Sequence, residues 1–250
     1  MSQRVAMTEE ARRLRSGASC RLYRGGPGAR VGVVVLHPWG PLGGSIHDPH
    51  VVVAARYFGA AGCATVRVQF RTGFSCGSSP VADVVAATDL VLDVPGIDRV
   101  VLVGYSYGSI VAMAAASEII TTSPGSLVGW VAVNPPLDYA WALFLSNGRA
   151  LLDKARRDSA GLPKLAIHAT RDQFCANASF DHFFDALPEP KTARRVEGAD
   201  HFNVVRALAG AFDAWLRSPP LSCAAGVDGL ARGDFLHGDD SAAGVPPRRP

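Results

Sequence analysis

Two stretches of the sequence place a serine between glycines at the spacing of a reactive serine turn. They are "GFSCG" at residues 73–77 and "GYSYG" at residues 104–108. Both fit G-x-S-x-G, which holds a serine on a sharp turn between a strand and a helix. A serine in such a place can attack a carbonyl carbon if a base accepts its proton. Because short glycine motifs also arise by chance, the surrounding elements must decide between the two.

Ser106 stands where a buried strand is followed at once by a helix. The apolar run "RVVLVGYS" (99–106) leads into it, and "SIVAMAAASEII" (109–120) follows with strong helix formers. The first N–H groups of that helix could stabilise an oxyanion. Gly104 and Gly108 flank the serine where strand and helix press together, so a Cβ at either position would crowd the turn. We therefore predict Ser106 as the nucleophile.

The other candidate, Ser75, lies in "RTGFSCGSSP" (71–80), a run of small and turn-prone residues. No strand leads directly into it, and Pro80 opens the next helix only five residues later. We interpret this stretch as a glycine-rich loop at the rim of the pocket.

His201 is the best candidate for the base among seven histidines. It follows the last predicted strand, in "VEGADHF" (196–202), at the entry to the final helix and on the same sheet edge as Ser106. The other histidines weighed are expected in a strand of the core (His168), on a surface helix (His182) and in the C-terminal tail (His237).

The acid that orients the base is expected to be Asp172, in "TRDQFC" (170–175), again after a strand. The chain order Ser, Asp, His agrees with this choice. Asp138, after the preceding strand, is the competitor, and a plain turn or helix-capping role for Asp172 stays open. Asp200 adjoins His201, and neighbouring residues seldom point their side chains at each other.

The loop "LHPWGPLGGS" (36–45) should supply an oxyanion donor, because it follows the first central strand. We predict the backbone N–H of Trp39, together with that of Tyr107. Glycines at positions 40, 43 and 44 would let the loop fold close to the substrate. His37 is assigned a structural role, in which it pins the loop by hydrogen bonds.

The elements that must position these residues alternate short apolar runs with helical segments. Strands are predicted at 30–37, 64–70, 99–106, 127–134, 164–170 and 192–198. Helices are predicted to start at Asp48 with Pro49 and at Ser79 with Pro80. A closing helix carries one apolar stripe, made of Val205, Leu208, Phe212 and Trp215. This alternation predicts an α/β fold with a mostly parallel sheet covered by helices on both faces.

Composition narrows the class of protein further. The chain has 250 residues, is 48% hydrophobic and 19% charged, and carries a net charge of +3. We expect one domain over 21–217, a flexible segment over 1–20 and a disordered tail over 218–250. The sequence shows no basic stripe, so nucleic acid is not an expected partner. It also shows no leader-like segment and no apolar run long enough to span a bilayer, so a membrane is not expected as a partner either.

Cysteine usage points to a reducing compartment. Five cysteines, odd in number and without a C-x-x-C pair, argue against both a disulfide framework and a zinc site. We therefore expect a cytoplasmic protein that needs no metal.

Together these residues resemble the α/β-hydrolase superfamily, and in particular its small, nearly lidless members with an "HP…GGS" oxyanion loop. The resemblance runs from about Val31 to Leu216 and rests on six motifs in the family's order: "LHPWGPLGGS", "FRTGFSCGSS", "VGYSYGS", "NPPL", "TRDQF" and "EGADHF". The second motif is one residue shorter than the family's pattern. The family's leading antiparallel strands are hard to see, since "SCRLYRGGPG" (19–28) leaves room for one hairpin.

The resemblance implies that Ser106 is the nucleophile, Asp172 the acid and His201 the base, with the Trp39 and Tyr107 amides as the oxyanion hole. It implies no metal and no organic cofactor. The expected reaction is acyl transfer from a small-molecule ester to water. Transfer to an alcohol or peroxide uses the same groups, and a scaffold or binding protein with little turnover is the alternative.

Substrate identity is weakly marked in the sequence. The residues between Asn134 and Pro163 are too few for a large lid, which favours a small, exposed acyl substrate. Tyr139, Trp141 and Phe144 are candidates for an aromatic pocket wall, and they could equally pack on the core.

Overall fold

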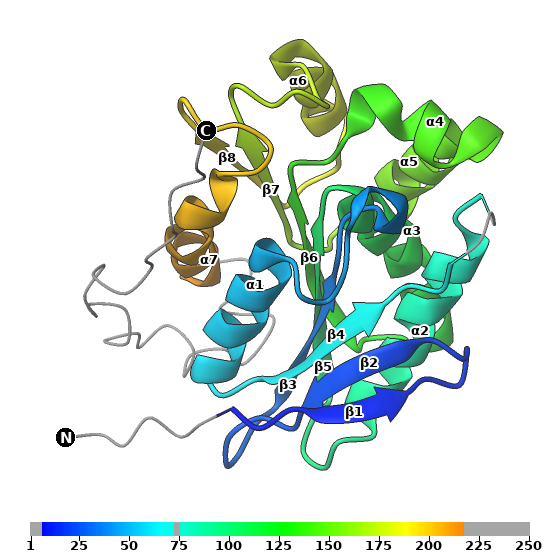
Figure 1. The fold of residues 1–250 in the computed structure, drawn as a ribbon, viewed down its shortest axis with the longest axis vertical. Helices are drawn as coiled ribbons and strands as arrows, with labels where there is room; N and C mark the ends of the chain where they lie inside the picture. The colour runs from blue at the N-terminus through cyan, green and yellow to red at the C-terminus, as the bar shows by residue number, and fades with distance from the viewer. Residues whose placement is uncertain (1–6, 73–75, 218–250) are drawn as a thin grey trace, which may run out of the picture.

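The computed structural model describes residues 7–72 and 76–217. In this part of the chain, eight strands form one sheet in the order β1-β2-β4-β3-β5-β6-β7-β8 (Figure 1). They are β1 Glu10–Arg13, β2 Ser19–Tyr23, β3 Val31–Leu36, β4 Ala64–Gln69, β5 Arg99–Tyr105, β6 Leu127–Val133, β7 Lys164–Ala169 and β8 Lys191–Val196.

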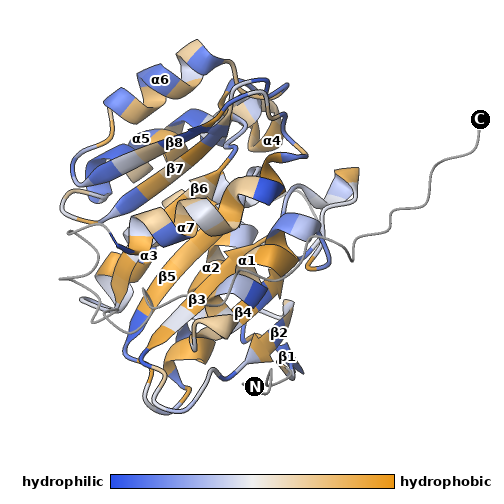
Figure 2. Ribbon diagram, turned by 90° about the vertical axis from the view of Figure 1, so that its left-hand side faces the viewer, coloured by the Kyte–Doolittle hydropathy of each residue, from blue (hydrophilic) through white to orange (hydrophobic). Residues whose placement is uncertain are grey.

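The sheet is parallel from β4 to β8, and β1 and β2 add an antiparallel hairpin at one edge. Strands β3 to β7 are buried along almost their whole length, which explains their continuous Val, Leu and Ile runs. Figure 2 shows this hydrophobic band through the centre of the molecule. Because the strands run the same way, their carboxyl ends meet at one edge of the sheet.

Helices cover both faces of the sheet. They are α1 Pro49–Ala60, α2 Ser78–Leu92, α3 Tyr107–Thr122, α4 Ala140–Leu143, α5 Gly148–Asp158, α6 Asn177–Asp185 and α7 Leu208–Leu216. Short 3-10 turns are η1 Gly40–Leu42, η2 Leu137–Tyr139, η3 Leu145–Asn147 and η4 Val204–Ala207. The predicted α/β architecture is confirmed, and α4 and α5 are the only α-helices between β6 and β7 in the described residues, so no large lid is present there.

Alternate strand residues build two separate cores. Val33 and Val35 of β3 face α1 and α7, whereas Val34 and Leu36 face α2 and α3. On the α7 side, Leu208, Phe212 and Trp215 are buried and Val205 packs beside them, as the stripe predicts. The two faces of one strand therefore hold helices from distant parts of the sequence.

The N-terminal region differs from expectation. The predicted flexible segment 1–20 contains β1 and the first residues of β2, which pair antiparallel, so the sheet begins before residue 21. Leu14, Ala18 and Cys20 are buried and anchor this hairpin to the core. The flexible segment was therefore wrong over β1 and β2. Its residues 1–6, and the tail over 218–250, lie outside the described residues.

Two predicted helix starts have different outcomes. Asp48 caps α1 as predicted, since its Oδ1 accepts a hydrogen bond from the His50 N–H at 2.9 Å. Helix α2 begins earlier than predicted, with Gly77 rather than Ser79 at the cap. Gly77 has φ of 93°, a left-handed conformation that glycine adopts without a steric cost.

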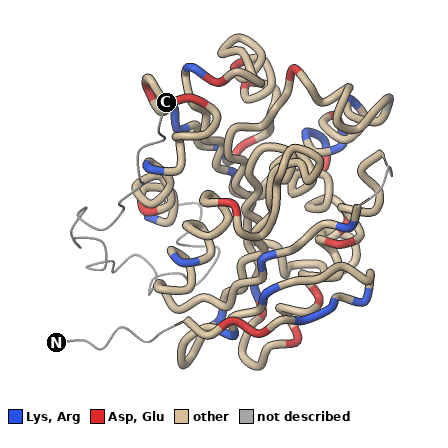
Figure 3. The backbone as a smooth tube through the Cα atoms, viewed as in Figure 1, with Lys and Arg blue, Asp and Glu red and all other residues tan. Residues whose placement is uncertain are grey.

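Charged residues of both signs are spread over the molecule (Figure 3). Several pair across elements, such as Arg24 with Glu10 at 2.8 Å and Arg67 with Glu9. Within the described residues, no helix is both long enough and apolar enough to traverse a bilayer.

Candidate active site

Ser106 lies on a strained turn between β5 and α3. Its φ of 53° and ψ of −122° are unusual for a residue with a side chain. The turn is held because the Ser106 N–H donates to the Val133 carbonyl of β6 at 2.9 Å, and the Ser106 carbonyl accepts from the Ser109 hydroxyl at 2.5 Å. Such strain indicates a position whose geometry is imposed by the surrounding fold.

The flanking glycines are required by space. A Cβ on Gly104 would lie 2.2 Å from the Gly108 carbonyl oxygen, and a Cβ on Gly108 would lie 2.7 Å from the His37 carbonyl oxygen. Real Cβ atoms do not approach backbone so closely. The crowding expected from the sequence is therefore present at both positions.

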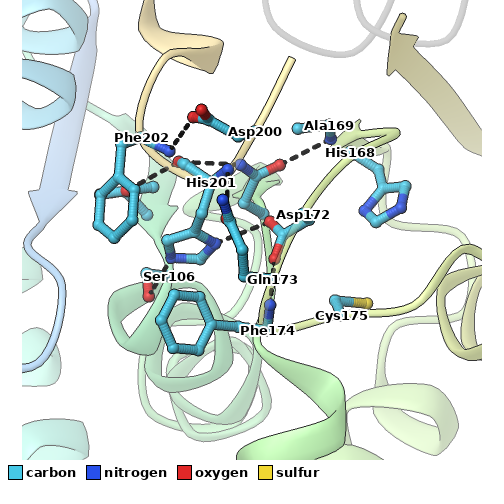
Figure 4. A network of polar contacts seen from close by, with 12 residues as sticks. Ser106, His168, Ala169, Asp172, Gln173, Phe174, Cys175, Asp200, His201 and Phe202 are labelled. Carbon is cyan, nitrogen blue, oxygen red and sulfur yellow. Dashed lines mark hydrogen bonds and ion pairs between the residues drawn. The ribbon is translucent and has the colours of Figure 1, made fainter. Parts of the chain in front are cut away.

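Three side chains form a hydrogen-bonded series at the carboxyl ends of β5, β7 and β8 (Figure 4). His201 Nε2 lies 2.9 Å from Ser106 Oγ, and His201 Nδ1 lies 2.7 Å from Asp172 Oδ2. The His201 residue is 3% exposed and the Asp172 side chain is fully buried. Since a carboxylate accepts at Nδ1, that nitrogen carries the proton and Nε2 can accept from the serine hydroxyl.

Hydrogen bonds also hold the main chain of His201. Its carbonyl accepts from the Tyr105 hydroxyl at 2.9 Å and from Asn134 Nδ2 at 3.1 Å. Its N–H donates to Gln173 Oε1 at 3.1 Å, and Asn134 Oδ1 accepts the Ala169 N–H at 2.9 Å. These supports were not predicted from the sequence, although polar residues at strand ends were the signal that could have found Asn134 and Tyr105.

The loop over residues 38–44, called the oxyanion loop below, is tied to the strand beside it. His37 Nε2 accepts the Phe70 N–H at 3.0 Å, and Nδ1 lies 2.5 Å from the Pro38 carbonyl. Burial lowers the pKa of His37, which favours the neutral ring that this pattern needs. A Cβ on Gly44 would lie 2.1 Å from the Pro38 oxygen. The loop thus folds back on itself, and His37 pins it as expected.

Two backbone amides are the expected oxyanion donors. Tyr107 is the first residue of α3, where helix N–H groups lack partners within the helix. Trp39 follows β3, and its N–H makes no hydrogen bond to another residue among those described. The Tyr107 ring stacks on Phe144 at 4.7 Å with an interplanar angle of 6°, which holds the start of the helix in place.

A cavity of about 310 Å³ is lined in part by Trp39 and Tyr107, whereas neither Ser106 nor His201 lines it. Its lining comes from the oxyanion loop, the end of β4, the start of α2 and the turns around α4; it includes Trp39, Phe70, Arg71, Tyr107, Leu143 and Leu145.

None of the three predicted pocket aromatics lines this cavity. Phe144 is fully buried in the core, whereas Tyr139 is 45% exposed and Trp141 is 71% exposed. The predicted aromatic wall is therefore wrong, and this segment lines the cavity with Ala142, Leu143 and Leu145 instead. The reason is that Phe144 turns inward to stack on Tyr107.

The competing acids are engaged elsewhere. Asp138 Oδ2 accepts the Ala176 N–H at 2.7 Å, just before α6. Asp200 Oδ1 accepts the N–H groups of Phe202 and Asn203 within its own turn. Neither carboxylate makes a hydrogen bond to the His201 ring among the described residues.

The competing histidines also lie away from Ser106. His168 is buried in β7, stacked on Phe180 at 4.4 Å, with Nε2 2.9 Å from Asn177 Oδ1. His182 is exposed on α6. The rival serine, Ser75, and His237 lie outside the described residues.

No metal site is evident in residues 7–72 and 76–217, where no three His, Cys, Asp or Glu side chains are grouped to hold an ion. The cysteines described there are free, and only Cys76 is exposed. Burial raises the pKa of Cys175 to about 12, so its thiol stays protonated and inert.

Solved structures share this architecture. A lidless α/β serine hydrolase from Xanthomonas campestris is 22% identical, with 85% of this chain and 95% of that chain covered and a TM-score of 0.66. Est1E from Butyrivibrio proteoclasticus is 13% identical over 82% and 97%, at 0.67. An esterase from Pyrococcus furiosus is 13% identical over 84% and 91%, at 0.65. At these identities the likeness concerns the fold.

Sequence comparison places the chain in a family. No curated protein matches the sequence. The model of the alpha/beta hydrolase family, however, matches residues 33–247. Because that match spans most of the chain, the protein belongs to the alpha/beta hydrolase family.

Proposed function

We propose that the protein is a serine hydrolase that cleaves a carboxylic ester or a related acyl substrate through an acyl-enzyme. The observation that carries the proposal is the series from Ser106 Oγ through the His201 ring to the Asp172 carboxylate, at 2.9 Å and 2.7 Å. Solved relatives described as a serine hydrolase and an esterase support it. In this proposal Ser106 is the nucleophile, His201 the base and Asp172 the acid.

Acylation begins when His201 Nε2 takes the Ser106 proton and Oγ attacks the carbonyl carbon. The carbonyl oxygen becomes an oxyanion, to which the Trp39 and Tyr107 amides donate hydrogen bonds. Asp172 stabilises the positive imidazolium that forms. One such amide typically contributes about a hundredfold to a thousandfold in rate, so the folding of the oxyanion loop matters to the reaction.

The intermediate then breaks down in the reverse sense. His201 donates its proton to the leaving oxygen, which departs as an alcohol and leaves the acyl group on Ser106. Water, activated by the same histidine, attacks the acyl-enzyme and releases a carboxylic acid. The hydrogen bonds that the His201 main chain accepts from Tyr105 and Asn134 and donates to Gln173 keep the ring in place through both proton transfers.

A fluorophosphonate probe and hydrolysis of short p-nitrophenyl esters test the proposal together. We expect wild-type protein to be labelled and to turn over ester, and Ser106→Ala to lose both, with kcat reduced by about a millionfold. The control is Ser75→Ala, in the second G-x-S-x-G stretch, which should keep both activities.

The contradicting outcomes are distinct. Loss of activity in Ser75→Ala but not in Ser106→Ala would reassign the nucleophile. Folded wild-type protein that neither labels nor turns over ester would point to a binding protein on a hydrolase fold.

A further inference from the structure

The cavity lies beside the proposed oxyanion donors and not beside the histidine. Trp39 and Tyr107 line it, whereas neither Ser106 nor His201 does. Three aromatic rings pack around the His201 ring: Phe174, the buried Tyr105 and Phe202, with ring centroids 4.6 Å, 5.3 Å and 5.4 Å from the imidazole. Figure 4 shows the two phenylalanines. Neither of these phenylalanines lines the cavity. A carbonyl carbon attacked by Ser106 would therefore have the cavity on the side of the two amides and these phenylalanine rings on the side of the histidine.

The chemistry of acyl transfer decides which part of the substrate enters which side. The leaving oxygen must come within hydrogen-bonding distance of His201 Nε2, because that nitrogen protonates it. The carbonyl oxygen must point at the two amides. The third substituent of the carbon, the acyl chain, is then directed away from the histidine, toward the cavity.

We propose that the cavity holds the acyl chain and that the Phe174 and Phe202 face holds the alcohol, so that the enzyme limits acyl length but accepts bulky apolar alcohols. This inference rests on the proposed function. It names the substrate class as esters of uncharged acyl groups of about ten or fewer non-hydrogen atoms. That limit follows from 310 Å³ and roughly 30 Å³ for each water-sized group.

The walls of the cavity favour an uncharged chain. Phe70, Pro80 and Leu143 give it apolar sides. Arg71 also lines it, but its guanidinium is 2.8 Å from the carboxylate of Asp83, whose side chain is fully buried. The pair is neutral as a unit, and an acyl carboxylate would meet no uncompensated positive charge there.

The alcohol side is open and aromatic. Phe202 is 63% exposed, Tyr139 is 45% exposed, and Tyr139 contacts Phe174 with ring centroids 5.6 Å apart. An apolar alcohol bound there would cover exposed ring surface without entering a closed space. Size on this side is therefore not limited as it is in the cavity.

Two ester series measure the two sides separately. In p-nitrophenyl esters from acetate to myristate, kcat/KM should rise by up to about fourfold per methylene and then fall beyond about ten acyl atoms. In ethyl, benzyl and naphthylmethyl butyrate, whose alcohols have similar acidity, kcat/KM should rise with size. Ala142→Trp, on the exposed side of α4 at the cavity, should reduce octanoate hydrolysis at least tenfold and acetate hydrolysis less than threefold.

Matched variants keep the two sides apart. Phe202→Ala should lower the naphthylmethyl-to-ethyl preference about threefold to tenfold and leave the acyl limit unchanged. Trp141→Ala, which removes an exposed ring that does not line the cavity, should leave both series unchanged. An acyl limit that Ala142→Trp does not move, or that Phe202→Ala does move, would overturn the inference.

Failure of this inference and of the proposed function can be told apart. The rate of Ser106 labelling by p-nitrophenyl alkylphosphonates of increasing chain length should show the same limit as the esters, and Ala142→Trp should shift it. Labelling of Ser106 with no dependence on chain length would overturn the inference alone. Absence of any labelling would overturn the proposed function and, with it, the inference.

Discussion

The two ends of the parallel strands both bury titratable side chains, but with different partners. At the carboxyl ends, each ring nitrogen of His201 meets another side chain, Ser106 Oγ on one side and Asp172 Oδ2 on the other. At the amino end of β7, Lys164 is 1% exposed, and its ammonium donates to the Leu162 carbonyl at 2.6 Å and the Pro190 carbonyl at 3.4 Å. Burial lowers the pKa of Lys164 to about 8.

The hydrogen-bond partners of a buried titratable group decide whether it can take part in proton transfer. Backbone carbonyls can accept a hydrogen bond but cannot take or return a proton, so Lys164 anchors the chain. A hydroxyl and a carboxylate around one imidazole can pass a proton along the series. The cavity of about 310 Å³ also lies at the carboxyl end, whereas the amino end has a hollow of about 110 Å³ lined by Lys164 and Pro190.

Among changes to the residues that position His201, removing the charge of Asp172 is expected to have the largest effect. Asp172→Asn should lower kcat about ten-thousandfold, because an amide in place of the carboxylate favours the wrong histidine tautomer. Ester turnover and thermal unfolding measure activity and folding separately. Asp138→Asn is the matched control and should retain most activity. Similar losses in both variants would contradict the assignment of Asp172.

Removing the support of the His201 main chain should have a smaller effect. Asn134→Gly keeps the positive φ of 45° but deletes the side chain that donates to the His201 carbonyl and accepts the Ala169 N–H. We expect a loss of about 1–3 kcal/mol in the free energy of unfolding, because buried backbone groups lose partners. We also expect kcat to fall more than KM rises.

The control for Asn134 is another asparagine. Asn147 donates to the Cys76 carbonyl at 2.9 Å near the surface, and Asn147→Ala should cost about 0.5 kcal/mol or less. If kcat of Asn134→Gly equals that of wild type, the hydrogen bond from Asn134 to the His201 carbonyl has no part in positioning the base.

At the other end of the sheet, the expected effect is on stability alone and is the smallest. The pKa of Lys164 falls from 10.5 in ordinary surroundings to about 8 on folding, so the unfolded chain binds more protons between these values. The free energy of unfolding should therefore gain a contribution that rises with pH from about 8 to 10.5.

Lys164→Met should remove this contribution and stabilise the protein at pH 7, with ester turnover unchanged. Denaturant unfolding at several pH values measures it, and Lys154→Met, at a partly buried position on α5, is the control. A variant less stable than wild type at pH 7 would mean that the two carbonyl bonds outweigh the cost of burying the charge.

Elements with strong local patterns were predictable, and those that depend on distant partners were not. The buried runs of β3 to β7 and the cap at Asp48 are visible in the sequence because neighbouring residues specify them. Strand β1, Glu10–Arg13, has one partly buried and three exposed residues, so no alternation signals it. It forms because β2 pairs with it and because Leu14 beside it is buried.

The same division runs through the candidate site. Ser106, Asp172 and His201 could be chosen from the sequence because each follows a predicted parallel strand, and parallel strands end at one edge. The cavity could not, because its lining is assembled from five separate segments and its shape depends on Phe144 turning into the core. Leu143 and Leu145 line the cavity in place of the predicted aromatic residues because the Phe144 ring points into the core and stacks on Tyr107.

The sequence alone was enough to predict the six parallel strands from β3 to β8, the glycines that a tight turn requires, and the polar residues at strand ends, since all of these are local properties. The tertiary structure was needed to show that the His201 ring contacts both Ser106 and Asp172 and that Tyr105 and Asn134 hydrogen-bond to its carbonyl. It was also needed to locate the cavity. The physical reason is that hydrogen bonds between side chains need partners within about 3 Å. Such distances are set by packing between segments as much as 96 residues apart, as for Tyr105 and His201.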